Sequence, residues 1–167
     1  MRLRTNLVTS TIAATILATA TMTGVAQSTG REAAKADIRK ALEDYVAAFS
    51  AGRADVIAER SVLAPMLNLG GAAVSTSMTA EDVRKRYDGN LKALAAQKYQ
   101  RSTVDSATVC LLNDAAAIVS GRFTRYRADG SVLSKIAATY VFARSDGQWK
   151  ITTLIGHGTD RAITCQE

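Results

Sequence analysis

Hydrophobic and polar residues follow two different periods along the chain, and the first is helical. Large apolar side chains recur every three or four residues near the start: Ile38, Leu42, Tyr45 and Phe49. This spacing places them on one face and predicts a helix from about Arg31 to Ala51. Gly52 is expected to end the helix, because glycine readily adopts the backbone conformation that follows a helix.

Two further helices are indicated before residue 100. Asp55 is expected to cap a short second helix. Thr79 followed by Asp82 resembles a capping box, in which each residue's side chain bonds the other's backbone. Apolar residues at helical spacing follow it, so a third helix is expected to run to about Gln97.

Most of the remaining chain has the period of two that is typical of strands. Residues 61–78 are expected to form two short strands around Gly70-Gly71. Four longer strands are expected after them: residues 99–112, 115–127, 132–144 and 148–157. The turn-forming pairs between these are Asn113-Asp114, Asp129-Gly130 and Asp146-Gly147. Because Asp-Gly between β-rich runs is a strong hairpin signal, the sequence predicts an α+β domain. Its curved antiparallel sheet has about six strands and wraps around the N-terminal helix, with two further helices.

Residues 1–26 have the three-part pattern of a secretory signal peptide. Arg2 and Arg4 give a positive start, residues 12–17 are mildly apolar, and Gly24-Val25-Ala26 offers small residues before a cut. An uncleaved anchor is the alternative, but the apolar stretch is short and rich in threonine, whereas a membrane span needs about 20 apolar residues. We therefore expect an exported protein, periplasmic or secreted, with no membrane segment after cleavage.

Charge and cysteine content narrow the expected partners. Cleavage leaves 19 basic and 15 acidic residues, and the net charge of +4 is spread without a dense basic run, so nucleic acid is not an expected partner.

Cys110 and Cys165 either form a disulfide or remain two thiols, and the export signal favours the disulfide. With one histidine they are too few for a zinc site, and no phosphate-binding glycine loop is present. Neither a metal nor a cofactor is expected.

Three local motifs resemble the nuclear transport factor 2-like superfamily. They are an aromatic-rich helix end, a helix start and the last hairpin: residues 45–55, 79–83 and 146–151. The order of helix, short helix, strand pair, helix and meander also resembles that superfamily. The resemblance implies a cone-shaped domain over residues 33–159, with a polar lead-in at 27–32 and a C-terminal tail at 160–167.

The superfamily includes ketosteroid isomerases, polyketide cyclases, dehydratases, transport adaptors and non-catalytic binding domains, and the resemblance implies an apolar cavity in the cone. An isomerase of this type needs a carboxylate base, and a protonated acid beside a tyrosine. Tyr45 matches the tyrosine, but residues 60–80, where the base is expected, contain no Asp or Glu. Residues 131–144, where the acid is expected, contain none either, and Thr139 or Tyr140 takes its place. The carboxylate mechanism is therefore disfavoured.

Strict alternation along the last strand places five residues on one face, which is expected to line the core: Trp149, Ile151, Thr153, Ile155 and His157. His157 is then expected at the open end of the cavity, as a base or a ligand anchor, with a rim residue bonded to backbone as the alternative. A basic strand end contains Arg122, Arg125 and Arg127; one of them can meet an anionic ligand, and the alternative is that they are solvated or paired on the sheet exterior. Asn68 can donate to a ligand carbonyl. The six candidate ligand-binding residues are Tyr45, Asn68, Arg125, Thr139, Trp149 and His157.

The leading functional prediction is a domain that binds a small, partly apolar molecule in the cone. One alternative is a lyase, cyclase or isomerase that uses His157 and Tyr45 as catalytic residues, although Tyr45 can equally fill the core. Another alternative is an interaction module that forms a homodimer through its sheet face.

Overall fold

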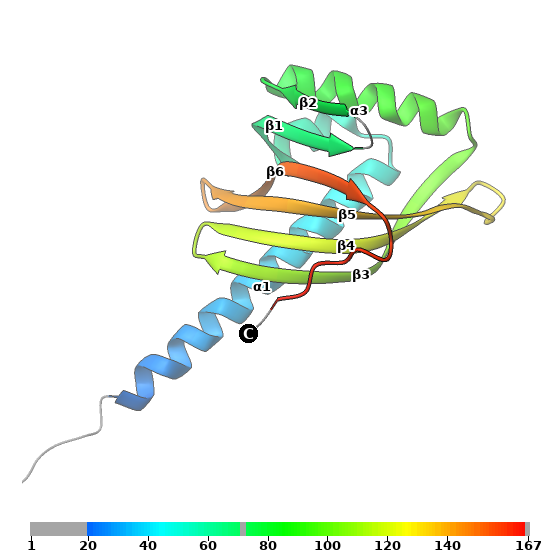
Figure 1. Ribbon diagram of the computed structural model, residues 1–167. Coiled ribbons are helices and arrows are strands. Elements are labelled where there is room, and N and C mark those ends of the chain that lie inside the picture. Colours follow the sequence, from blue (N-terminus) through cyan, green and yellow to red (C-terminus); the bar gives the residue numbers. More distant parts are fainter. Residues whose placement is uncertain (1–19, 71–72, 166–167) are drawn as a thin grey trace, which may run out of the picture.

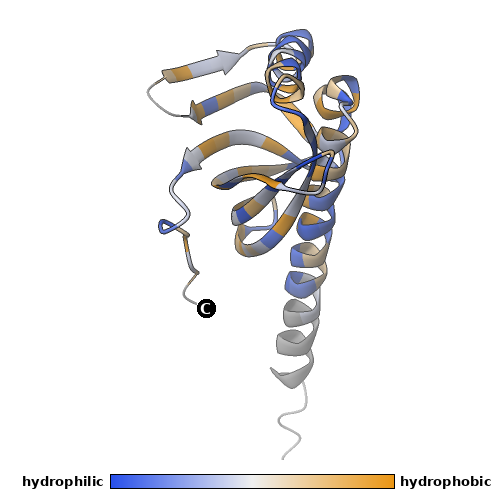
Figure 2. Cartoon of the chain, turned by 90° about the vertical axis from the view of Figure 1, so that its right-hand side faces the viewer, coloured by the Kyte–Doolittle hydropathy of each residue, from blue (hydrophilic) through white to orange (hydrophobic). Residues whose placement is uncertain are grey.

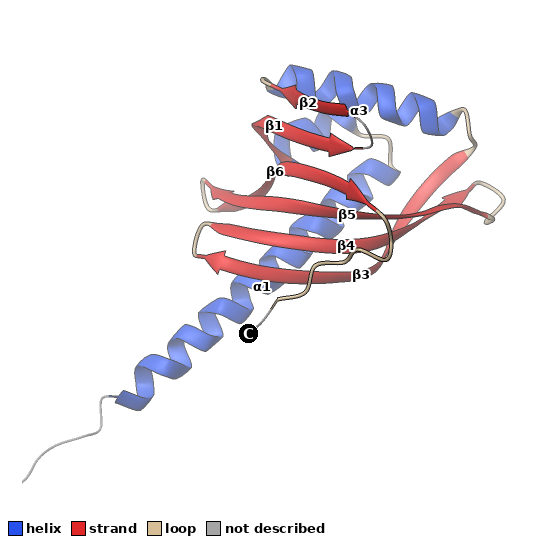
Figure 3. Cartoon of the chain, viewed as in Figure 1, coloured by secondary structure: helices blue, strands red, loops and turns tan. Residues whose placement is uncertain are grey.

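The computed structural model describes residues 20–70 and 73–165 (Figure 1). In chain order the helical elements are α1 (Ala20–Ser50), α2 (Ala54–Val56), the π-helix η1 (Ile57–Ser61) and α3 (Ala80–Ala95). The strands are β1 (Val62–Gly70), β2 (Ala73–Ser77), β3 (Tyr99–Asn113), β4 (Ala116–Arg127), β5 (Val132–Ser145) and β6 (Gln148–His157). The helices lie on one face of a single curved sheet, which confirms the predicted α+β architecture (Figure 3).

The six strands are ordered β2-β1-β6-β5-β4-β3. The predicted meander is confirmed, because β3, β4, β5 and β6 pair antiparallel with their neighbours in sequence. The prediction of a wholly antiparallel sheet is wrong at one place, since β1 pairs parallel with β6. Hairpin turns specify only the pairing of consecutive strands, whereas β1 and β6 are far apart in the sequence and no turn signal joins them.

The core lies between α1 and the concave face of the sheet. The apolar face predicted for α1 is buried, with Ile38 and Leu42 almost fully enclosed. Phe142 of β5 and Ile151 of β6 close the core from the sheet side. Burying four such side chains contributes roughly 1.5–3 kcal/mol each, so this layer is a main source of stability.

Helix α1 begins at Ala20, earlier than the expected start near Arg31. Residues 27–32, expected as a polar lead-in, are therefore helical. They contain no proline, and a helix that is already nucleated by packing extends at little cost. Residues 1–19 of the expected signal peptide lie outside the described residues.

Local capping chemistry is partly as predicted. The capping box before α3 is present, because the Asp82 backbone N–H donates to Thr79 Oγ1 at 3.1 Å and the Thr79 N–H donates to Asp82 Oδ2 at 3.0 Å. The predicted cap by Asp55 is wrong. Arg53 occupies the cap position of α2, and its guanidinium pairs with the Asp55 carboxylate at 2.7 Å.

A β-bulge in β6 changes which side chains face the core. Thr153 pairs with Val141, whereas Ile151 pairs with Phe142, so Thr152 is an extra residue between two ladder pairs. Beyond the bulge the alternation is inverted: Leu154 pairs with inward-facing Tyr140. The expectation that Thr153, Ile155 and His157 share the face of Trp149 and Ile151 is therefore wrong.

The C-terminal tail crosses the sheet face opposite the helices, here called the outer face (Figure 2). A disulfide joins Cys165 of the tail to Cys110 of β3, which confirms the predicted bridge. The tail is also held by hydrogen bonds to β4. The backbone N–H of Ile163 donates to Ser120 Oγ at 3.1 Å, and Arg122 Nε donates to the Thr159 carbonyl at 2.8 Å. These contacts fix the tail over the middle of the outer face.

Candidate functional site

Two adjoining hollows are present where β4, β5 and β6 meet the interior of the cone. The larger, here called the rim groove, has a volume of about 560 Å³. Its lining includes Arg125, Lys135, Ile136, Tyr140, Leu154 and His157. The smaller, here called the inner hollow, has a volume of about 30 Å³, which is room for about one water molecule. Arg125, Ile136 and Tyr140 line both, so the two hollows meet at these residues.

Aromatic side chains fill most of the space where the resemblance implied a cavity. Tyr45 lies at their centre, with ring centroids 6.2 Å from Phe49, 6.0 Å from Tyr87 and 5.8 Å from Tyr140. Phe123 packs edge-on against Tyr140 at 6.0 Å. Ring contacts at these distances and tilts are favourable, so this cluster stabilises a closed interior. The open volume lies at the rim.

The tyrosines of the cluster are buried, and two of their hydroxyls are hydrogen-bonded to each other. Tyr45 and Tyr87 share a buried hydrogen bond of 3.2 Å between their hydroxyl oxygens. Burial raises the pKa of Tyr45, and it raises the pKa values of Tyr87 and Tyr140 further above their usual range. All three phenols are therefore neutral at physiological pH and can donate a hydrogen bond.

Arg125 is a charged group that contacts this cluster. Its guanidinium carbon lies 5.9 Å from the centre of the Phe49 ring. Its buried Nε has no hydrogen-bond partner in the described structure. No ion pair between described residues involves it. The contact with the Phe49 ring partly stabilises the Arg125 cation. Because a buried N–H without an acceptor is unfavourable, an acceptor that reached Nε would stabilise the site.

His157 and Tyr45 are not brought together. His157 pairs with Ala137 on the outer face, whereas Tyr45 lies inside the cone. Both imidazole nitrogens are occupied: Nε2 lies 2.9 Å from Thr139 Oγ1, and Nδ1 lies 2.9 Å from the Gly158 carbonyl oxygen. Because a carbonyl only accepts, Nδ1 carries the proton in this arrangement. His157 thus lies at the edge of the rim groove, with its ring hydrogen-bonded to Thr139 and to the Gly158 carbonyl.

The other three candidates lie in different places. Thr139 is buried on the outer face, where its hydroxyl also bonds Ser120 at 3.1 Å, so Tyr140 rather than Thr139 faces the interior. Asn68 pairs with Leu154 on the inner face but does not line either hollow. Trp149 is buried at the opposite end of β6. Of the six candidates, Tyr45 and Arg125 lie together at the inner hollow, and His157 lies at the outer edge of the rim groove.

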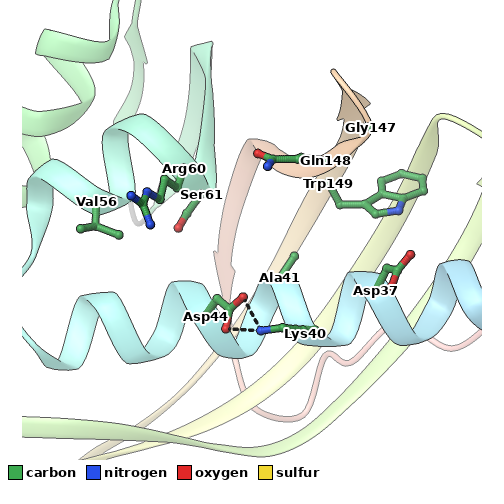
Figure 4. Close-up of a pocket in the computed structure, with 10 residues that line it drawn as sticks. All are labelled: Asp37, Lys40, Ala41, Asp44, Val56, Arg60, Ser61, Gly147, Gln148 and Trp149. Carbon is green, nitrogen blue, oxygen red and sulfur yellow. Dashed lines mark hydrogen bonds and ion pairs between the residues drawn. The ribbon is translucent and has the colours of Figure 1, made fainter.

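Trp149 instead lines the largest hollow, a groove of about 740 Å³ between α1, η1 and the β5–β6 hairpin (Figure 4). The lining of this groove includes the polar side chains of Asp37, Arg60 and Gln148. Lys40 and Asp44 within it pair with each other at 2.8 Å, and both are exposed. Exposed ion pairs of this kind are screened by solvent and contribute little. We therefore place the candidate site at the rim groove, where the charge is unpaired and meets aromatic side chains.

The chemistry available at the rim groove is binding rather than carboxylate catalysis. No Asp or Glu is among the described residues that line either hollow. A carboxylate base for proton abstraction is therefore missing from the described residues around Tyr45 and Tyr140. No cluster of three or more His, Cys, Asp or Glu side chains in residues 20–70 and 73–165 is arranged to hold a metal ion. Within the same residues, no helix has the length and apolar character that a membrane crossing requires.

Two contributors to the site are not among the six candidate ligand-binding residues. Lys135 lines the rim groove, and Tyr140 separates it from the inner hollow. Tyr140 was an alternative to Thr139, and the pairing of β5 with β4 decides between them. Lys135 precedes the apolar run of β5 and carries no local signal that distinguishes it from a solvated surface lysine.

The fold and this site define an NTF2-like cone with a packed interior. A family model described as NTF2-like protein (DUF6841) matches residues 33–159. The chain therefore belongs to the NTF2-like protein family. No curated protein matches the sequence.

Solved structures show the same fold at low identity. An NTF2-like protein with a cystatin-like fold from Novosphingobium aromaticivorans is 17% identical, with a TM-score of 0.69, over 86% of this chain and 93% of that one. An NTF2-like protein of unknown function from Shewanella oneidensis MR-1 is 16% identical, with a TM-score of 0.60, over 73% and 97%. A putative calcium/calmodulin-dependent protein kinase II association domain from Xanthomonas campestris is 19% identical, with a TM-score of 0.55, over 71% and 83%. At these identities the likeness concerns the fold alone.

Proposed function

We propose that this NTF2-like domain binds a small, partly apolar molecule in the rim groove. The observation that carries the proposal is the junction of the groove with the aromatic interior at Arg125, Ile136 and Tyr140. The groove's volume of about 560 Å³ lies in the range of known ligand sites, about 300–1,000 Å³. Apolar walls with few polar groups are the usual composition of such sites.

The groove can be blocked without disturbing the core. Gly156 lines it on the inner face, opposite Ala138. A Cβ added at Gly156 would meet only the Gly70 Cα, at 3.7 Å, which is an ordinary contact. Gly156→Phe therefore places a ring in the groove. Gly89→Phe is the matched control, because a Cβ at Gly89 on α3 meets nothing within 4 Å and Gly89 does not line the groove.

The test is native mass spectrometry of protein purified from its own compartment, followed by calorimetry with octanol and octanoate. The proposal expects a bound molecule, or binding of at least one probe, in the wild type and in Gly89→Phe. Gly156→Phe should lose it. Equal binding by both variants, or no binding of any kind by the wild type, would contradict the proposal.

A second candidate function is homodimer formation through the outer face. Four large aliphatic side chains of β1, β5 and β6 are only partly buried there: Leu67, Leu69, Val141 and Ile155. Their ladder pairs place them in neighbouring positions, beside the part that the tail covers. An apolar surface of this kind is typical of interaction sites. The similar Xanthomonas structure is titled an association domain, which agrees with this candidate.

Light scattering across a range of protein concentrations tests the dimer. Val141→Glu should shift the equilibrium to monomer, because it places a charge within the apolar surface. Val132→Glu, at an exposed position in the β4–β5 hairpin, should leave the equilibrium unchanged. A wild type that stays monomeric at high concentration would refute the dimer.

We also propose that the domain works outside the cytoplasm. The Cys110–Cys165 disulfide supports this, because disulfides persist mainly in oxidising compartments. Mass measurement of the native N-terminus is the test, with the expected cut after Ala26. A native protein that retains Met1 or Arg2 would contradict cleavage.

A further inference from the structure

We propose that the ligand of the rim groove is an amphipathic carboxylate whose headgroup pairs with Arg125. The inference rests on the proposed binding function and adds the chemical class of the molecule. Its apolar part would lie along Ile136 and Leu154 of the groove, and its carboxylate would reach the junction with the inner hollow.

The first support is the unused hydrogen-bonding capacity of Arg125. Its Nε is buried without a partner, although leaving a buried donor unsatisfied is unfavourable. The residue lies on the inner face between two small ladder partners, Ser102 and Ser134, and its side chain is only partly buried as a whole. An acceptor in the groove would satisfy this donor.

The second support is the sign of the surrounding charge. Arg125 and Lys135 both line the groove, and no described lining residue is acidic. A cation next to aromatic rings and without a carboxylate partner favours an anion over a neutral or positive ligand. The ion pair would form partly out of water, beside Phe49 and Tyr140, where it is screened less than at the surface.

The third support is the shape of the junction. A guanidinium presents parallel N–H groups that match the two oxygens of a carboxylate. The inner hollow, at about 30 Å³, admits one small polar atom group and not a ring. Tyr45 and Tyr140 line it, and no acidic side chain among the described lining residues competes with a carboxylate there. The site thus suits a small planar headgroup on an apolar chain.

Calorimetry with octanoate and octanol separates this inference from the underlying binding function. Octanoate should bind the wild type about ten- to a hundredfold more tightly than octanol, the range expected when a charged group gains hydrogen bonds. Arg125→Gln should weaken octanoate binding by the same ten- to hundredfold and so abolish the preference for octanoate over octanol. Arg39→Gln, an exposed arginine on α1 outside the groove, is the matched control and should retain the preference.

Each outcome decides one of the two claims. Equal binding of octanoate and octanol by the wild type would overturn the carboxylate inference and leave the binding function intact. Binding of neither molecule would overturn the carboxylate inference, and it would overturn the binding function as well if native mass spectrometry also finds no bound molecule. Should Arg125→Gln fail to fold, as judged by circular dichroism, Arg125→Lys replaces it and should reduce the preference for octanoate over octanol, because an ammonium cannot form the paired hydrogen bonds. The wild-type comparison of the two probes is decisive in either case.

Discussion

Breaking the disulfide between Cys110 and Cys165 tests how the C-terminal tail contributes to stability. The two cysteines are separated by 55 residues. In the loop-entropy model, a cross-link that closes a loop of that length lowers the entropy of the unfolded chain by an amount worth about 4 kcal/mol. This is a large part of the roughly 5–15 kcal/mol that stabilises a domain. We expect the double variant Cys110→Ser/Cys165→Ser to fold but to be markedly less stable.

Urea denaturation followed by circular dichroism measures the effect. With an m-value of about 2 kcal/mol/M, a loss of about 4 kcal/mol lowers the midpoint by about 2 M. Reduced wild type should match the double variant, because both lack the same cross-link. Ser120→Ala in the oxidised protein is the control for the tail's other contacts. It removes the acceptor of the Ile163 N–H and should cost only about 1 kcal/mol.

The reasoning fails if oxidised and reduced wild type unfold at the same urea concentration. That result would mean that the tether does not restrict the unfolded chain. A Ser120→Ala variant as unstable as the double cysteine variant would instead assign the stability to the tail's native contacts. Alkylation and mass measurement before each experiment confirm the oxidation state of Cys110 and Cys165.

Three further predictions concern the interior and its caps. Tyr87→Phe should lower the free energy of unfolding by about 1–3 kcal/mol, because it leaves the buried Tyr45 hydroxyl without this partner. The double variant Tyr45→Phe/Tyr87→Phe should recover part of that loss, since neither hydroxyl is then left unpaired; strictly additive losses in urea denaturation would disprove the pairing. Because the pKa values of Tyr45, Tyr87 and Tyr140 are raised in the folded protein, their contribution to stability is complete below the ordinary tyrosine pKa of about 10 and is lost as the pH rises above it. The absorbance of phenolate should rise together with unfolding, and ionisation of all tyrosines while the protein stays folded would contradict this. Thr79→Ala should cost about 1 kcal/mol in thermal or urea unfolding, and an unchanged midpoint would show that the capping box contributes nothing.

The elements could be predicted because their signals are local. The Asp129-Gly130 and Asp146-Gly147 pairs lie at the observed hairpin turns, where both glycines have positive φ. The capping box before α3 is likewise contained within a few residues. The parallel pairing of β1 with β6 joins distant segments, and its register follows from packing that no short motif records.

The site was harder to predict, because one extra residue in β6 reverses the side of every residue after it. Apolar side chains lie at both Leu154 and Ile155, so the pattern fits either phase beyond the two threonines. The bulge at Thr152 turns Leu154 inward and His157 outward. Strict alternation therefore predicted His157 on the core face at the open end of the cavity, whereas it is observed on the other face, bonded to Thr139.

The packed interior also limits what any ligand of this cone can be. A rigid molecule larger than a few atoms fits the inner hollow only if Tyr140 moves, and Tyr140 makes ring contacts with Tyr45, Phe123 and Phe142. Such contacts contribute about 0.5–1.5 kcal/mol each beyond the burial of the ring, so displacing Tyr140 would cost several kcal/mol of binding energy. A ligand that keeps its apolar part in the rim groove and extends only a small headgroup to Arg125 avoids this cost. The same geometry that disfavours a bulky substrate therefore favours an elongated, singly charged one.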